Sequence, residues 1–177
     1  MEDLSDTERY APFEWTRVEL TPQRSSALAA VAAHWEKSRE GRATSKWSTA
    51  ELECLPSKLL SFCTVADTGN GEPPFLYRFF GTGLANMHTF ELSRKTTDSI
   101  EPEGFRHLCV DQNLMVINEQ KPLTFMTKVP TKQPELYRNH LILRLPYSDD
   151  ENHISQIMTI EETEDAPRDT WELFRTE

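Results

Sequence analysis

The chain has 177 residues, which suits one domain with terminal extensions, and its 37% of hydrophobic residues is enough for one core. Its formal net charge is -10 at pH 7, and it lacks the clustered Lys and Arg that bind phosphate backbones, which argues against a nucleic-acid partner. The sequence also lacks an apolar run near the roughly 18 residues of a membrane span and the apolar segment of a secretory signal, so we expect a cytoplasmic protein with no membrane partner.

The N-terminal part predicts an arm followed by a helix. Residues 1–20 are largely polar and charged, and we expect them to form a flexible N-terminal arm. Residues 21–41 predict a flanking helix, because Thr21 can cap it, Pro22 suits its first turn and Gly41 suits its end.

One apolar stripe on this predicted helix has two possible uses. Its members recur at helical spacing and share one face. They are Leu28, Val31, Ala32 and Trp35. Such a stripe can pack on the parent sheet or on a second copy of itself, and the sequence alone does not choose. We favour the second use, a homodimer interface, because the helix stands outside the compact unit that follows it.

Residues 42–163 predict one α+β domain. Two strands joined by a turn rich in Gly and Pro are followed by short helices, one long helix and three further strands. The predicted strands are 59–67, 75–80, 123–129, 136–147 and 153–162, and the long helix is 103–119. This order predicts a five-stranded antiparallel sheet with helices on one face. Residues 164–177 form an acidic C-terminal tail.

The space between the long helix and the sheet is a natural place for a ligand cavity. Gln112 is informative, because it is an amide within an apolar stripe and a buried amide needs partners. Those partners can be backbone or water, or a molecule bound under the helix. His88 lies at the predicted mouth of the cavity, where it is either a ligand contact or a surface histidine. The residues predicted to contact a ligand are Phe79, Met87, His88, Gln112, Met115 and Phe125.

The glycines and cysteines give no support for a nucleotide, zinc or redox site. Gly81-Thr82-Gly83 follows a predicted strand, but Asn86 stands where a dinucleotide fingerprint needs its third glycine, so a tight strand-to-helix turn is the better interpretation. The three cysteines have no C-x-x-C spacing, and we expect them to be free thiols. They are Cys54, Cys63 and Cys109.

The acids and histidines predict no catalytic residue, metal site or cofactor. The sequence has no G-x-S-x-G motif and no H-x-x-x-H spacing. His107 points away from the apolar face of the long helix, which argues against an axial haem ligand. Asp67 and Asp98 are the acids conceivable for an acid–base pair inside an α+β cone, and both stand at turn positions where capping explains them.

Several motifs between residues 28 and 162 carry a resemblance to known proteins. They are Trp35 with Arg39 and Gly41, Tyr77-Arg78-Phe79-Phe80-Gly81-Thr82, Glu91-Leu92-Ser93-Arg94-Lys95, and Leu143-Arg144-Leu145-Pro146-Tyr147-Ser148-Asp149-Asp150. With the order of elements, they resemble a PAS domain, and in particular a PAS family of stand-alone bacterial proteins once catalogued as a domain of unknown function. That family usually has Gly where Arg94 stands.

The resemblance implies a small-molecule sensing or protein-interaction module and supplies no ligand, catalytic residue or cofactor. Our leading hypothesis is a non-enzymatic sensory module that binds a small molecule between the long helix and the sheet and signals through a protein partner. The alternative is a ligand-free homodimerisation module whose core is filled by large side chains. Those side chains are Phe79, Phe80, Phe90, Phe105 and Phe125. An enzyme on a similar α+β cone is the third hypothesis.

Overall fold

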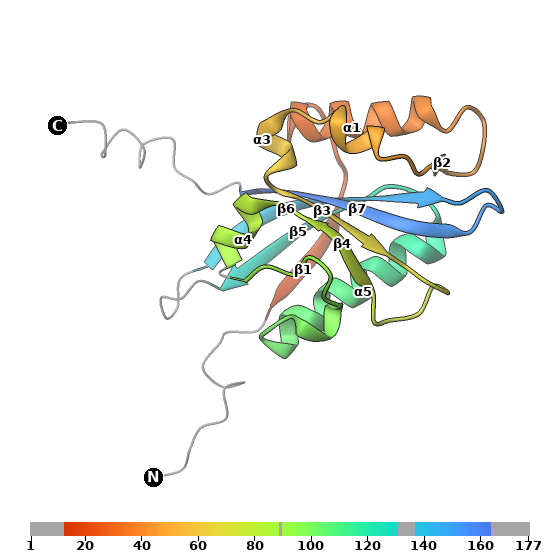
Figure 1. Ribbon diagram of the computed structural model, residues 1–177. Coiled ribbons are helices and arrows are strands. Elements are labelled where there is room, and N and C mark those ends of the chain that lie inside the picture. The colour runs from red at the N-terminus through yellow and green to blue at the C-terminus, as the bar shows by residue number, and fades with distance from the viewer. Residues whose placement is uncertain (1–12, 89, 131–136, 164–177) are drawn as a thin grey trace, which may run out of the picture.

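A computed structural model describes residues 13–88, 90–130 and 137–163 (Figure 1). Most of the predicted arm, residues 1–12, and the predicted acidic tail, residues 164–177, lie outside this described part. None of the described helices combines the length and the apolar character that a membrane crossing needs.

The described elements follow the predicted order closely. The strands are β1 (Glu14–Val18), β2 (Ser45–Lys46), β3 (Cys63–Asp67), β4 (Leu76–Phe80), β5 (Leu123–Pro130), β6 (Tyr137–Ser148) and β7 (Ile154–Thr163). The helices are α1 (Ser26–Ser38), α2 (Ala50–Glu53), α3 (Ser57–Leu60), α4 (Thr82–His88), the 3₁₀ helix η2 (Thr97–Ser99) and α5 (Glu103–Glu119). The fold is therefore α+β, as predicted.

All described strands belong to one sheet, in the order β1-β5-β6-β7-β3-β4, with β2 running parallel to the end of β6. The neighbours in this order are antiparallel. The five predicted strands are all present, and two more extend the sheet beyond the predicted count of five. The architecture is consistent with a PAS-like fold.

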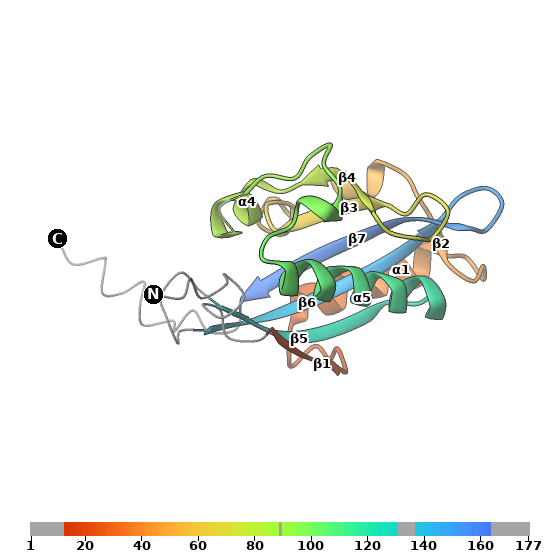
Figure 2. The same ribbon diagram turned by 90° about the horizontal axis from the view of Figure 1, so that it is seen from below.

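Strand β1 corrects the prediction that residues 1–20 form a flexible arm throughout. Glu14–Val18 pair with β5 in a continuous register from Glu14 opposite Lys128 to Val18 opposite Thr124 (Figure 2). The indole of Trp15 meets the ring of Phe125 edge-on, with centroids 5.3 Å apart. The strand therefore covers the edge of β5 that would otherwise present unpaired backbone groups.

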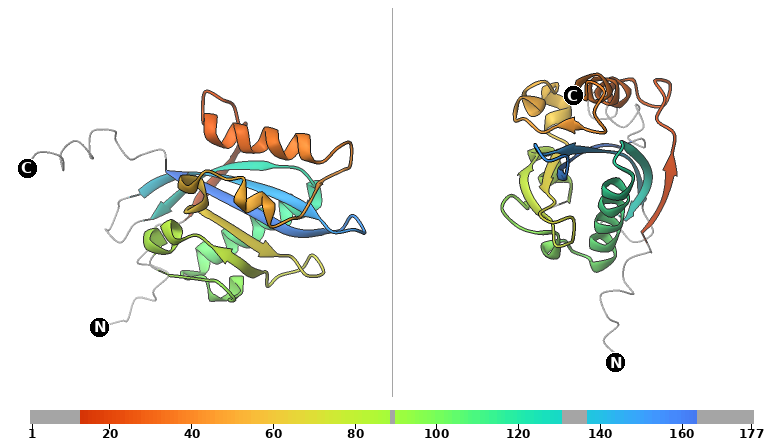
Figure 3. Two further views of the ribbon diagram at one scale, coloured as in Figure 1. Left: turned by 45° about the horizontal axis from the view of Figure 1, so that its top comes forward. Right: turned by 90° about the vertical axis from the view of Figure 1, so that its right-hand side faces the viewer.

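Helices cover both faces of the sheet and not one face, as Figure 3 shows. Helices α4 and α5 lie on one face and α1 lies on the other. Side chains alternate along each central strand, so Leu143 and Leu145 of β6 face α1 while Arg144 faces α5. Both faces of β6 and β7 are consequently buried.

The apolar stripe of α1 packs on the sheet of its own chain, which corrects its assignment to a homodimer interface. Leu28 and Trp35 are 0% and 2% exposed and belong to a cluster with Val65 and Leu143. The indole nitrogen of Trp35 donates a hydrogen bond of 2.7 Å to the carbonyl of Pro146. The two remaining stripe members, Val31 and Ala32, are partly buried against the same cluster. The stripe is thus used within the monomer, because β6 offers an equally apolar surface.

Two glycines predicted to mark a turn are needed for close packing. Neither Gly81 nor Gly83 has a positive φ. A Cβ atom at Gly81 would lie 2.3 Å from the carbonyl oxygen of Ser61, and one at Gly83 would lie 2.8 Å from the same atom. The strand-to-helix turn is therefore confirmed, and its glycines are explained by the backbone that passes beside them. By contrast Arg94, where the resembling family usually has Gly, does have a φ of 64°.

We predict that Leu28→Ala lowers the free energy of unfolding by about 2–5 kcal/mol, since it removes a fully buried side chain from the core between α1 and the sheet. Lys37→Ala, on the exposed face of α1, should change it by less than about 0.5 kcal/mol. Urea denaturation measures both. The loss of unfolding free energy in Leu28→Ala should not depend on protein concentration. A loss that disappears in dilute protein would show that the stripe packs against a second copy of the chain.

Candidate functional site

Large side chains pack into the space between α5 and the sheet in the described part of the chain. A cavity of about 20 Å³ lies there, which is room for about one water molecule. Its wall is mostly aromatic and aliphatic, with a polar end. The wall consists of Thr64, Tyr77, Phe80, Leu84, His88, Phe90, Leu92, Ile100, Phe105, Cys109, Arg144, Thr159 and Glu161. An organic ligand of ordinary size has no room in it.

The six residues predicted to contact a ligand do not come together around this cavity. Only His88 lines it. Phe79 packs with the cluster on the α1 face, Met87 packs beside the cavity wall, and Met115 and Phe125 belong to a separate cluster near Val116. Gln112 is fully buried, and its hydrogen bonds go to protein side chains. Four of the five phenylalanines expected to fill the core do lie on this face, while Phe79 does not.

Arg144 of β6 is the centre of a buried polar network under α5. It is 3% exposed. Its Nε donates to Oε1 of Gln112 at 3.0 Å, and its Nη1 donates to Oδ1 of Asn113 and to Oγ1 of Thr159, each at 2.9 Å. Gln112 in turn donates to Oγ1 of Thr127 at 3.4 Å. The network joins α5 to three strands and satisfies the amide that the sequence marked as unusual.

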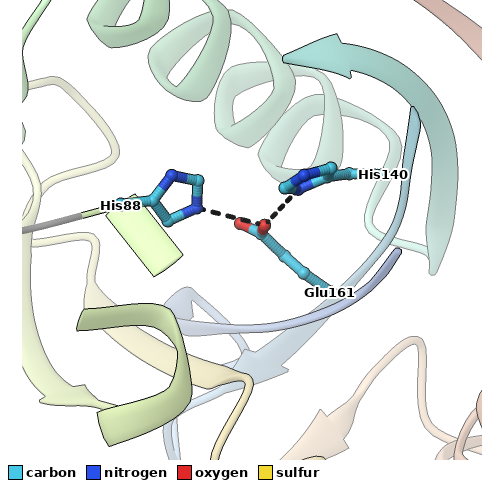
Figure 4. A group of neighbouring side chains, drawn as sticks. All are labelled: His88, His140 and Glu161. Carbon is cyan, nitrogen blue, oxygen red and sulfur yellow. Dashed lines mark hydrogen bonds and ion pairs between the residues drawn. The ribbon is translucent and has the colours of Figure 1, made fainter. Parts of the chain in front are cut away.

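A second polar group lies beside it, where His88 and His140 both point toward the carboxylate of Glu161 (Figure 4). Oε2 of Glu161 is 3.4 Å from Nε2 of His88 and 3.0 Å from Nδ1 of His140. The three side chains are 8%, 1% and 10% exposed. His88 is the last residue of α4, His140 lies on β6 and Glu161 lies on β7. We call these three residues the His–Glu–His cluster.

Neighbouring aromatic rings and charged groups determine the environment of the His–Glu–His cluster and the ionised state of Glu161. The rings of Phe90 and Phe105 lie 5.6 and 5.1 Å from the ring of His88. Burial disfavours the charged form of Glu161, but hydrogen bonds from His140 and His88 outweigh it and hold the pKa of this carboxyl well below its usual range. Glu161 is thus an anion inside the protein, and the guanidinium of Arg144 faces the same cavity with the opposite charge.

The His–Glu–His cluster has the donor atoms of a metal site. The two imidazole nitrogens and the carboxylate oxygen lie within 4.8 Å of one another. The sequence prediction of no metal site relied on local spacing, which does not reveal ligands from three elements. One signal was present: His140 and Arg144 are polar residues at inward positions of a buried strand.

The thiols and acids considered for catalysis do not form a catalytic arrangement in the described part of the chain. Burial raises the pKa of Cys109 to about 11 and also raises that of Cys63, so neither is a ready thiolate. Asp67 is bonded to Arg78 at 2.9 and 3.1 Å, and Asp98 lies on η2.

A larger pocket lies on the opposite face of the sheet, between α1, α2 and α3. Its volume is about 240 Å³. It is lined by Ala27, Ala30, Val31, His34, Glu51, Cys54, Leu55, Pro56, Leu59, Tyr147 and Met158. At its polar end Nε2 of His34 is 3.1 Å from Oε2 of Glu51, whose side chain is 14% exposed. Burial and the charge of Glu51 raise the pKa of Tyr147, which keeps this phenol protonated. We call this pocket of about 240 Å³ the α1 pocket. A separate and more open groove of about 610 Å³ runs between α1 and β1.

Comparison with known proteins supports no functional assignment. No protein-family model matches the chain, and no curated protein matches its sequence. One similar solved structure is described as an RNA-binding Light-Oxygen-Voltage receptor; it is 10% identical, with a TM-score of 0.42 over 87% of this chain. The chain spans 40% of that protein's length. We draw no functional conclusion from a likeness this distant.

We predict that Arg144→Met lowers the free energy of unfolding by about 3–5 kcal/mol, because it leaves the buried oxygens of Gln112, Asn113 and Thr159 without their donor. The matched control is Arg78→Met, which breaks an exposed ion pair with Asp67 and should cost at most about 1 kcal/mol. Urea denaturation of both variants tests this. Equal losses of unfolding free energy in the two variants would show that the buried network stabilises the fold no more than an exposed ion pair does.

Proposed function

We propose that this protein is a non-enzymatic sensory module of the PAS type that binds a small molecule in the α1 pocket and signals through contacts with another protein. The observation that carries the proposal is the contrast between the two faces of the sheet. The α1 face has a pocket of about 240 Å³, whereas the cavity described under α5 has a volume of about 20 Å³. We therefore propose a ligand on the face opposite to the one that the sequence suggested.

The lining of the α1 pocket indicates the class of ligand. Most of the wall is aliphatic, and its polar groups gather at one end around Glu51, His34 and Tyr147. A small number of polar groups in an apolar pocket is typical of ligand sites, although this volume is below the common range of about 300–1,000 Å³. A carboxylate at one end favours a hydrogen-bond donor or a cation. The pocket thus suits a small aliphatic molecule with an amine or hydroxyl head.

The position of the pocket suits a signalling role. Its walls come from three separate helices on one side and from Tyr147 and Met158 of two central strands on the other. Helices α2 and α3 have four residues each, so packing and not internal hydrogen bonding holds them in place. A ligand that enters between them and α1 would change the surface that these helices present to a partner.

The ligand-free interaction module remains a second candidate, because the core under α5 is filled as that hypothesis requires. Homodimerisation also stays a proposal, although the Leu28–Trp35 stripe does not supply its interface. The two candidates differ in one property: only the sensory module needs a molecule to occupy the α1 pocket.

A matched series of probes tests the α1 pocket. We expect 1-hexylamine to bind in about the millimolar range, 1-hexanol more weakly, and hexanoate not at all, because Glu51 repels a carboxylate. Ligand-observed NMR on the full chain measures all three. The variant Ala30→Leu puts a larger side chain at the exposed rim of the pocket and should weaken binding, while Ala33→Leu adds the same side chain to an exposed position of α1 that does not line it.

Three results would contradict the proposal. Equal binding of amine, alcohol and acid would show that the polar end recognises nothing. Unchanged binding in Ala30→Leu would place the probe elsewhere, and no binding by any probe would favour the ligand-free module. Glu51→Gln should remove the preference for the amine while leaving the alcohol bound, which separates loss of recognition from loss of folding.

A further inference from the structure

We propose that His88, His140 and Glu161 bind one divalent transition-metal cation beneath α5, and that zinc is the best match. This site is on the other side of the sheet from the α1 pocket, so it does not depend on the proposed ligand. Two imidazoles and a carboxylate are a donor set that zinc uses in sites with one open position, and nitrogen donors favour transition metals over calcium and magnesium.

The geometry of the His–Glu–His cluster fits a cation after small shifts. Zinc bonds nitrogen and oxygen at about 2.0–2.2 Å, so neighbouring ligand atoms of a tetrahedral site lie about 3.3–3.6 Å apart. The carboxylate oxygen is 3.4 Å from one imidazole nitrogen and 3.0 Å from the other, and all three atoms lie within 4.8 Å of one another. A cation among them would replace the two N–H donors that Glu161 now accepts, with each imidazole carrying its proton on the other nitrogen.

The surroundings supply the rest of a buried site. The cavity of about 20 Å³ is lined by His88 and Glu161, and it has room for one water as a fourth ligand. The burial of all three donors holds them in place and excludes bulk water. The guanidinium of Arg144 opposes a cation, but it would favour hydroxide or another small anion at the open position. A cavity of about 20 Å³ has no space for an organic substrate, so we assign the cation a sensing or structural role.

Metal binding would act on α4 in particular. Of the three donors, His140 and Glu161 lie on adjacent strands of the sheet, whereas His88 ends a helix of seven residues. A cation would therefore tie the end of α4 to the central strands more firmly than one hydrogen bond of 3.4 Å does. The alternative is a metal-free cluster in which the two imidazoles simply donate to the carboxylate.

Isothermal titration of the metal-free full chain with Zn²⁺ tests the proposal. We expect one equivalent of Zn²⁺ to bind, no comparable binding of Mg²⁺ or Ca²⁺, and visible bands of tetrahedral Co²⁺ when Co²⁺ is used as a probe. His88→Phe keeps a ring against Phe90 and Phe105 but removes a ligand, so it should weaken Zn²⁺ binding by more than the roughly 10- to 100-fold typical of outer-shell changes.

The control separates this site from exposed histidines. A variant with His34→Ala, His107→Ala and His153→Ala keeps the His–Glu–His cluster and should bind Zn²⁺ like the unmodified chain. Loss of binding in this triple variant, or retention of full affinity in His88→Phe, would overturn the proposal. So would the absence of Zn²⁺ binding by the unmodified chain. Circular dichroism establishes that each variant is folded, and Glu161→Gln provides a second ligand change of nearly the same shape.

Discussion

A buried arginine on a central strand determines what the space under α5 can contain. The guanidinium of Arg144 cannot lie in this core unless its donors are satisfied and its charge is compensated, because an unpaired buried charge costs several kcal/mol. Gln112, Asn113 and Thr159 accept its hydrogen bonds, and Glu161 places a negative charge on the same cavity. Glu161 in turn needs donors, which His88 and His140 supply. Each polar group on this face is thus required by another.

That chain of requirements explains why the two faces of the sheet differ. Under α5 the polar network and the surrounding aromatic rings line a cavity of about 20 Å³, which can hold a water or an ion. On the opposite face a pocket of about 240 Å³ lies between α1, α2 and α3, and the exposed Ala27 and Ala30 of α1 are among the residues that line it. The described pockets on the two faces thus differ in the size of the molecule that they can take.

The regular elements were predictable from periodicity, but the site was not. The stripe of α1 fits either a sheet or a second helix, and only the three-dimensional structure shows β6 beneath it. The amide of Gln112 marked a buried polar contact, because its place in an apolar stripe is visible in the sequence. The contact between His140 and Glu161 was not visible in the sequence, because it depends on how β6 and β7 are paired. The register of this pair shifts between Tyr147 and Ser148. If residues were paired one by one outward from the β6–β7 turn, Glu161 would be placed one residue away from its observed partner, Ile142. A shift of one residue would assign its side chain to the wrong face of the sheet.

The same two strands connect the faces. Met158 and Tyr147 line the α1 pocket, while the neighbouring Thr159 bonds to Arg144 and lines the cavity on the other side. Because neighbouring residues of a strand point to opposite faces, a shift of β7 under the α1 pocket also moves Thr159 relative to Arg144. Coupling between occupants of the two sites would be reciprocal, each changing the affinity of the other by the same factor. Strands β6 and β7 carry side chains of both sites, so such coupling would pass through this pair of strands.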